Sequence, residues 1–305
     1  MQGISQTQVS GTMQKKDLKI NRRAFIEATA VLGAASQMWS GAGVSPALAA
    51  TAGDMTLEDM TALAEHYYSG LGYSPVKPSP VISNAEFNGG LNYDEDGMGA
   101  GATRPVYVVQ PCARVEDALT PDKPGTLPLF TVLGFYPAEE STRQHRTRDL
   151  LTFMTVTAGL DPKRLRITTT DLARPLFPEF NSFGISAAQI RVQSLEKARA
   201  AGSGSGWFEP KGHPNKTAYA SYSIEYVMSD GTEIEIAEVG VEPVPPHHGG
   251  GAIGLDRMTM ARNDRIAASG HETSTFQQAI EAEASRSGKP LPPGYYTILG
   301  LPQPG

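Results

Sequence analysis

Arg257 stands out as a side chain that could bind an anion, because of what precedes it in the chain. Residues 249–251 are three consecutive glycines, which let the backbone pass close to another group. After Gly254 the apolar residues recur at helical spacing, which predicts a helix that begins there. A guanidinium beside glycines and helix-start amides suits a phosphate or another anion. An ordinary capped helix with a surface arginine is the alternative interpretation.

Arg114 is the second candidate, because it ends a predicted strand over residues 104–114 that is rich in β-branched and aromatic residues. Arginine suits both positions, since its planar fork binds two phosphate oxygens at once and keeps its charge. A surface ion pair at the strand end is the alternative for Arg114. Cys112 lies inside the same strand and is expected to be a buried small hydrophobe and not a nucleophile.

Three histidines, with nearby acids, raise a third possibility. His213, His247 and His248 could converge with Glu238 and Glu242, and two imidazoles with a carboxylate suit a divalent metal ion. Adjacent histidines on a loop rarely point the same way, so solvent-facing histidines are the alternative.

The elements that must position these residues centre on a predicted hairpin. Apolar residues alternate over positions 222–228 and again over 234–239, and Asp230-Gly231 between them is a strong turn signal. Further predicted strands cover residues 81–83, 127–136, 165–169 and 189–193. Helices are expected over residues 57–70, 141–160 and about 275–287, and Asp171 is expected to cap one more. The glycine-serine tract at 202–206 is interpreted as a loop within one domain.

The N-terminus is similar to a twin-arginine export signal. Arg22 and Arg23 precede a mildly apolar run, and small residues at 47–49 would suit a signal peptidase. This run is too weak to span a bilayer permanently. Residues 1–49 are therefore expected to be a signal read by the twin-arginine translocase, with the mature protein in the periplasm or secreted. A cytoplasmic protein with a chance arginine pair is the alternative.

Composition limits the remaining possibilities. The chain has 305 residues, 40% hydrophobic and 19% charged, which is ordinary for a globular protein. Without residues 1–49 it would keep 21 basic and 30 acidic residues, a net charge of −9, which disfavours extended nucleic-acid binding. The single cysteine excludes an internal disulfide framework.

Gly254-Leu255-Asp256-Arg257 resembles the third signature motif of class II aminoacyl-tRNA synthetases, whose arginine contacts the terminal phosphate of ATP. The order of elements extends this resemblance to the catalytic core of alanyl-tRNA synthetase. The segment from Gln110 to Arg114 looks like the second motif, and the strand that begins at Phe130 looks like its returning strand. The resemblance implies an α+β fold, with a class II antiparallel sheet flanked by helices, over residues 50–305 as a single domain.

The resemblance also implies site residues and cofactors. ATP and Mg²⁺ would be bound, and Arg114 and Arg257 would act in catalysis by holding the phosphates. The implied contacts to ATP come from Arg114, Glu116, Phe130, Gly254 and Arg257. The implied contacts to the substrate come from Trp207, Glu238 and Gly250; the family has asparagine in place of this Glu238 and aspartate in place of this Gly250.

Two functions follow as hypotheses. The first is an adenylate-forming ligase that activates a small carboxylic or amino acid with ATP, without a tRNA-binding domain. The second is an exported, non-catalytic protein that binds a small molecule, either an anion or a metal ion, on the same fold.

Overall fold

The hairpin expected at the centre of the chain is present. Strand β9 (Tyr219–Val227) pairs antiparallel with β10 (Glu233–Gly240). In the turn between them, Gly231 adopts a φ of 87°, which favours glycine, and the Thr232 N–H donates to Asp230 Oδ1 at 2.8 Å. The aspartate-glycine turn signal therefore predicted both the position of the turn and the pairing of its strands.

The structure is a computed structural model, and it describes part of the chain. The described residues are 54–79, 82–83, 86–87, 104–114, 124–125, 127, 129–137, 142–202, 204–208, 219–240, 250–266 and scattered positions between 281 and 298. They belong to the unit Gly53–Gly305. The predicted export signal lies outside the described residues, and so does nearly all of the helix expected at about 275–287.

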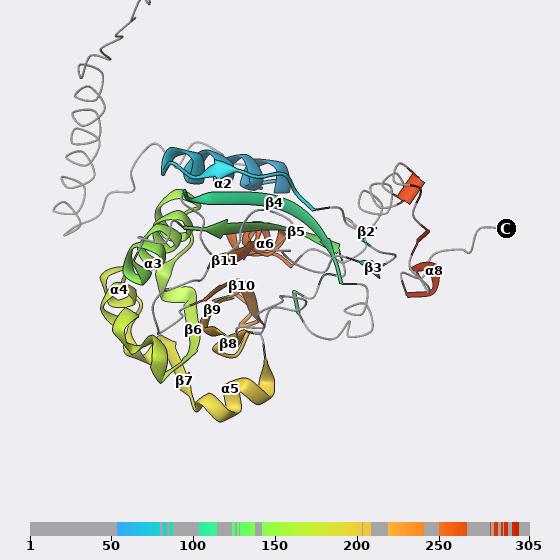
Figure 1. The fold of residues 1–305 in the computed structure, drawn as a ribbon. Coiled ribbons are helices and arrows are strands. Elements are labelled where there is room, and N and C mark those ends of the chain that lie inside the picture. Colours follow the sequence, from blue (N-terminus) through green and yellow to red (C-terminus); the bar gives the residue numbers. More distant parts are fainter. Residues whose placement is uncertain are drawn as a thin grey trace, which may run out of the picture. The chain divides into compact units, whose positions relative to one another are not determined.

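Within the described residues, nine strands form one sheet in the order β1-β4-β5-β11-β10-β9-β6-β7, with β8 paired to β9 (Figure 1). The other strands of this sheet are β1 (Ser74–Pro75), β4 (Val106–Ala113), β5 (Leu129–Tyr136), β6 (Leu165–Thr170), β7 (Ile190–Gln193), β8 (Trp207–Phe208) and β11 (Gly251–Gly254). Among these strands only β1 with β4 and β6 with β7 are parallel. A small second sheet joins β2 (Ile82–Ser83) to β3 (Glu86–Phe87).

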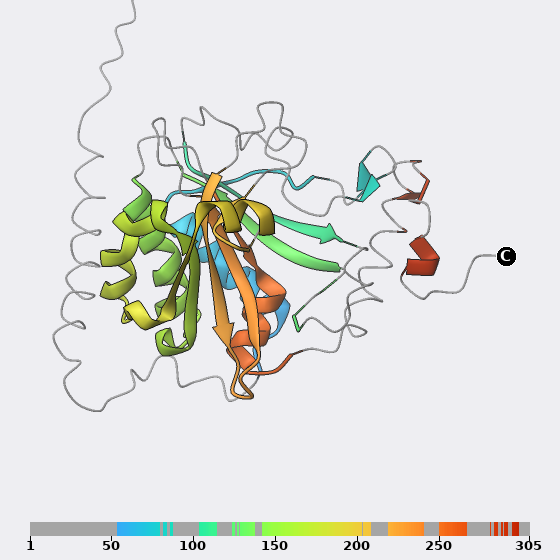
Figure 2. The ribbon, with the colours of Figure 1, turned by 90° about the horizontal axis from the view of Figure 1, so that it is seen from below.

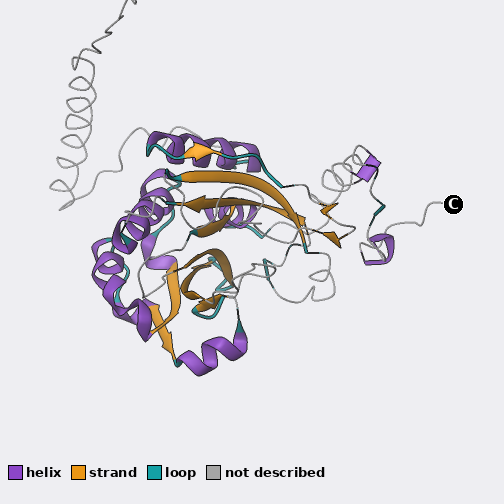
Figure 3. Ribbon diagram, in the orientation of Figure 1, coloured by secondary structure: helices purple, strands orange, loops and turns teal. Residues whose placement is uncertain are grey.

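Helices flank the sheet, as Figure 3 shows by colour. The α-helices are α2 (Leu57–Gly70), α3 (Arg143–Thr152), α4 (Phe177–Ser182), α5 (Leu195–Ala201), α6 (Leu255–Asn263) and α8 (Tyr295–Ile298). Shorter 3-10 and π segments are η2 (Phe153–Thr157), η3 (Pro162–Arg164), η4 (Asp171–Leu176) and η5 (Ala187–Gln189). The expected α+β class, a mainly antiparallel sheet flanked by helices, is confirmed. No helix in the described part of the chain is both long and apolar enough to cross a membrane.

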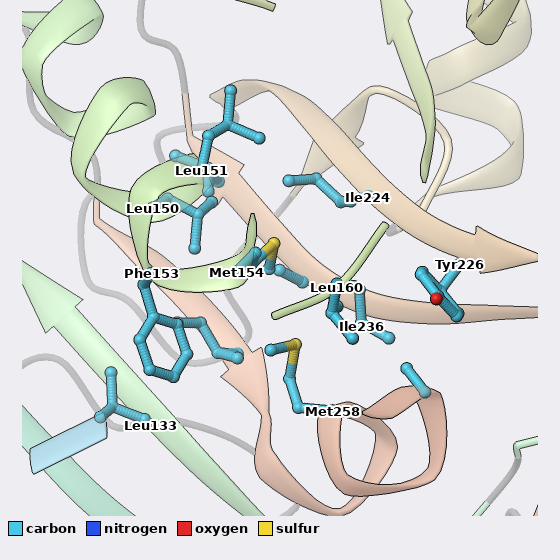
Figure 4. Close-up of a cluster of buried hydrophobic side chains, with 14 of the residues drawn as sticks. Leu133, Leu150, Leu151, Phe153, Met154, Leu160, Ile224, Tyr226, Ile236 and Met258 are labelled. Carbon is cyan, nitrogen blue, oxygen red and sulfur yellow. The ribbon is translucent and has the colours of Figure 1, made fainter. Parts of the chain in front are cut away.

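The two faces of the sheet differ in chemistry, because successive side chains of a strand point to opposite faces. We call one face the helical face. It carries buried apolar residues such as Ile224 and Leu133, against which Met154 and Met258 pack (Figure 4). Helices α2 and α6 lie side by side, with α6 packed on β5 and β10 (Figure 2).

We call the opposite side the polar face. The strand register places on it Phe130 of β5, Ala252 of β11, Glu238 of β10 and Ser223 of β9. These four residues come from four neighbouring strands, so segments distant in sequence share one surface.

Several local expectations need correction. The glycine run leads directly into a strand, since β11 begins at Gly251 and pairs with both β5 and β10. Asp171 does not cap a helix; it is the first residue of η4, whose N-cap Thr170 makes no side-chain cap hydrogen bond. The helix expected over 141–160 ends its regular part at Thr152 and continues as a π turn. Helix α5 was not expected from the sequence at all.

Candidate functional site

Phe130 is the residue around which the two candidate arginines gather. The guanidinium carbon of Arg114 lies 5.2 Å from the centroid of the Phe130 ring, and that of Arg257 lies 5.9 Å from the same centroid. Both distances fall within the range in which a cation is attracted by the face of an aromatic ring. Two residues that are distant in sequence are thereby brought to one ring on the polar face.

The position of Arg257 follows from the start of α6. Gly254, in an extended conformation, is the N-cap residue, and Arg257 lies in the first turn of the helix. Its Nε donates to the carbonyl oxygen of Gly125 at 2.8 Å, and its NH1 donates to that of Glu235 at 3.3 Å. Asp256 is buried and accepts the backbone N–H of Thr131 at 2.5 Å, which ties the helix start to β5. The guanidinium of Arg257 is therefore held between β10 and the segment before β5.

Arg114 reaches the same ring from β4. Cys112 lies opposite Phe130 in the β4–β5 pairing, so Arg114 follows just beyond the ring at the strand end. Arg114 is exposed, whereas Cys112 is fully buried, as expected for a small hydrophobe. The end of β4 and the start of α6 thus each place one guanidinium near the Phe130 ring.

The glycines near Arg257 have different structural roles. A Cβ atom on Gly250 would lie 2.3 Å from the carbonyl oxygen of Phe135, and one on Gly251 would lie 2.4 Å from the Phe135 ring. Glycine is therefore needed at both positions because β11 approaches β5 so closely. A Cβ on Gly254 would meet only the Arg257 side chain, at 3.6 Å. The structure thus gives Gly250, expected to contact substrate, a clear packing role.

Trp207 is not brought to the arginine pair. It is only 6% exposed, belongs to the hydrophobic core, and has the guanidinium of Arg199 4.4 Å from its ring centroid. Its strand β8 pairs with β9, which β10 and β11 separate from β5. Trp207 therefore lies on the far side of the sheet's centre from Phe130.

Glu238 lies on the polar face and accepts a hydrogen bond from a neighbouring loop. Its Oε1 accepts the backbone N–H of Gly204 at 3.0 Å and the hydroxyl of Ser221 at 3.0 Å. Gly204 adopts a φ of 83°, and a Cβ there would lie 3.1 Å from the carboxylate of Glu235. The loop after α5 consequently sits against the acidic part of the sheet.

An acidic patch next to Glu238 was not recognised from the sequence. We define the acidic patch as Ser223, Glu225, Glu235 and Glu238, which form two cross-strand pairs between β9 and β10, Ser223 with Glu238 and Glu225 with Glu235. The signal was present as polar residues at alternate positions of β9, opposite the buried Tyr222, Ile224 and Tyr226. The β-bulge between Glu235 and Ala237 determines which residues of β9 and β10 are cross-strand neighbours. No local sequence pattern predicts this bulge.

Burial raises the pKa of the Glu225 carboxyl to about 7. The hydrogen bond from Thr168 opposes this rise, the negative charge of Glu235 adds to it, and the positive charge of Arg191 opposes it. Glu225 therefore changes charge near neutral pH, which is unusual for a glutamate and frequent at functional sites.

Four predicted site residues, Glu116, His213, His247 and His248, lie outside the described residues, so the predicted metal site stays a prediction. In the part of the chain that the structure describes, no group of three or more histidine, cysteine, aspartate or glutamate residues is arranged to hold a metal ion.

No protein-family profile and no curated protein sequence matches this chain. Among solved structures, it is similar to apo histidyl-tRNA synthetase of S. aureus, with a TM-score of 0.42 and 11% identity over 83% of each chain. It is also similar to an aspartyl-tRNA synthetase from Entamoeba histolytica, with a TM-score of 0.38 and 15% identity over 68% of this chain and 54% of that one. Both neighbours are class II aminoacyl-tRNA synthetases, and neither is an alanyl-tRNA synthetase.

Proposed function

We propose that this protein activates a carboxylic acid by transferring to it the adenylyl group of ATP. The observation that carries the proposal is the pair of guanidiniums, from Arg114 and Arg257, gathered on the Phe130 ring. Such a pair offers planar, permanently charged donors to two neighbouring phosphates of one nucleotide. The resemblance of the Arg257 motif to the third motif of class II synthetases, noted from the sequence, points to the same ligand.

The elements that carry the pair are suited to holding a nucleotide in one geometry. Phe130 belongs to β5, an interior strand of the sheet, and Arg114 ends the adjacent β4. Arg257 is fixed by two backbone carbonyl oxygens. Groups held this firmly accelerate a reaction chiefly by position and charge, and they need little other protein chemistry. Mg²⁺ bound with the nucleotide would neutralise part of the phosphate charge.

The reaction itself balances without an additional reagent. A carboxylate oxygen of the substrate attacks the α-phosphorus of ATP, and a new bond forms between that oxygen and phosphorus. The bond from the α-phosphorus to the oxygen bridging to the β-phosphate breaks, and pyrophosphate leaves with that oxygen. We propose that Arg114 stabilises charge at the α-phosphate and Arg257 stabilises charge on the departing phosphates.

An exported binding protein is the second candidate, and the predicted twin-arginine signal at residues 1–49 favours it. ATP is scarce outside the cytoplasmic membrane, so a ligase exported there would lack its co-substrate. The same arginine pair could then hold an anionic ligand without chemistry. We favour adenylation over binding alone because the structure brings the two arginines to one aromatic ring.

Exchange of labelled pyrophosphate into ATP tests the proposal. The full chain is assayed with MgATP and a panel of amino and carboxylic acids, and one member should support exchange. Arg257→Ala should abolish that exchange. Arg174→Ala is the matched control, because Arg174 is also an arginine over a phenylalanine ring, 5.9 Å from the centroid of Phe177, on an exposed part of the fold. MgATP binding without exchange would favour the binding protein, and failure to bind MgATP would reject the ligase.

A further inference from the structure

Two buried oxygen atoms of the acidic patch lack a partner among the described residues. Ser223 is completely buried, yet its Oγ makes no hydrogen bond. Oε2 of Glu225 is also buried without a hydrogen bond. Leaving such groups unsatisfied is costly, by about 1–3 kcal/mol for each group in proteins. Unsatisfied polar atoms in a folded core therefore indicate that a group outside the described residues supplies the missing hydrogen bonds.

The register directs these atoms to the same place. Ser223 and Glu225 are two positions apart on β9, so both side chains project from the polar face. Their cross-strand partners on β10 are Glu238 and Glu235. Each of the two residues with an unsatisfied oxygen thus has a glutamate as its cross-strand neighbour on the same surface.

Two basic side chains near the patch, those of Arg191 and Arg166, are engaged elsewhere. Arg191 pairs with Glu233, with both nitrogens donating to that carboxylate, and Glu233 lies outside the patch. Arg166, whose Cα lies opposite that of Glu225, donates to the carbonyl oxygens of Lys163 and Leu165. The patch therefore carries negative charge that a positively charged ligand would complement.

The patch is displaced across the sheet from Phe130 and Arg114, whereas Arg257 NH1 donates to the carbonyl oxygen of the patch residue Glu235 at 3.3 Å. Glu225 and Ser223 are on β9, whereas Phe130 is on β5, three strands away in the order β5-β11-β10-β9. At about 4.8 Å for each strand, the backbones are roughly 14 Å apart. Arg114 ends β4, one strand further out, so a ligand that contacts both Glu225 and Arg114 has to be extended.

We propose that the acidic patch binds the terminal ammonium group of a long-chain basic amino acid, such as lysine, whose carboxylate faces Arg114. The ammonium donates hydrogen bonds to Glu225 and Ser223, and Glu235 supplies further negative charge. This inference rests on the proposed function in that it names the class of acid that is activated. It replaces the small substrate expected from the sequence with one that carries a positive charge at its far end.

Calorimetric titration of the full chain with L-lysine and L-norleucine, in buffer containing EDTA, tests the inference. The two amino acids share the unbranched side chain and differ in the terminal ammonium. Lysine should bind about 10- to 100-fold more tightly, the usual value of a charge-assisted hydrogen bond to a buried group. Glu225→Gln should remove most of that preference, and Ser223→Ala should reduce it about three- to tenfold. Glu196→Gln, at an exposed position of α5, should leave it unchanged.

The outcomes separate this inference from the proposed function. Equal binding of lysine and norleucine, or binding of neither, would overturn the inference, even if another acid supports pyrophosphate exchange. Lysine binding that Glu225→Gln does not weaken would also overturn it. Lysine binding that depends on Glu225, without any exchange of pyrophosphate, would uphold the inference while rejecting the ligase.

Discussion

Replacing Glu225 by glutamine should change how the free energy of unfolding depends on pH. In the folded protein, burial raises the pKa of Glu225 from its ordinary value of 4.5 to about 7. The groups that face it are Thr168 and Arg191, which oppose the rise, and Glu235, which adds to it. Arg166 lies opposite on β6 with its guanidinium bound to backbone carbonyls. Glutamine resembles the protonated carboxyl in shape but does not ionise.

The direction of the effect follows from linkage between protonation and folding. Below pH 4.5 the carboxyl is protonated in both the folded and the unfolded chain, so it contributes no pH dependence. Between pH 4.5 and about 7 the unfolded chain loses the proton first, so the stability of the folded protein falls as the pH rises. Above about pH 7 the carboxyl is ionised in both states, and the folded protein has lost all of the stability that burying the charged carboxyl costs. The shift corresponds to about 3 kcal/mol at most, and partial solvent access reduces the expected cost to about 1–3 kcal/mol.

Urea unfolding at pH 4 and pH 8.5 measures this cost. Glu225→Gln should match the unsubstituted chain near pH 4 and exceed its free energy of unfolding by about 1–3 kcal/mol at pH 8.5. Glu196→Gln should behave as the unsubstituted chain at both values. If Glu225→Gln shows the same difference at both values, the carboxyl does not titrate near neutrality, and the reasoning about its burial is refuted.

Two other changes have clear expected results. Gly251→Ala should lower the free energy of unfolding by about 1–3 kcal/mol in urea, because its Cβ would overlap a buried phenylalanine ring. Gly254→Ala should change it by less than about 0.5 kcal/mol, since its Cβ would meet only a flexible side chain. Arg22→Lys together with Arg23→Lys should retain a reporter fused after Ala49 inside the cytoplasm; export of that double variant would show that the arginine pair is no signal.

The parts of the fold that the sequence predicted are those with strong local signals. The hairpin of β9 and β10 combines apolar alternation with an aspartate-glycine turn. Helix α2 begins with a capping box formed by Thr56 and Asp59, so its bounds were predicted correctly. Helix α6 follows from apolar spacing after Gly254. In each case the chemistry that fixes the element lies within a few residues of it.

What could not be predicted depends on tertiary packing. The seven-residue helix α5 has little apolar periodicity to predict it. Its packing against β8 and β6 stabilises it in the folded chain. The extended state of the glycines before Arg257 depends on close approach to Phe135, which no local pattern reveals.

Arg114 and Arg257 were named both from local patterns and from the resemblance, and Phe130 was named from the resemblance alone. The structure brings these three residues together. The acidic patch depends on the pairing of β9 with β10 through a bulge, so Ser223 and Glu225 were not recognised. Trp207, named from the same resemblance, belongs to the hydrophobic core.

The most direct test of the arginine pair is the affinity of the full chain for MgATP, measured by isothermal titration calorimetry. Arg114→Ala should weaken binding about 10- to 100-fold, because it removes a charge-assisted contact to phosphate. Arg174→Ala, another exposed arginine over a ring, should bind MgATP as tightly as the unsubstituted chain. Equal affinities for Arg114→Ala and the unsubstituted chain would contradict the claim that both guanidiniums at Phe130 hold one nucleotide.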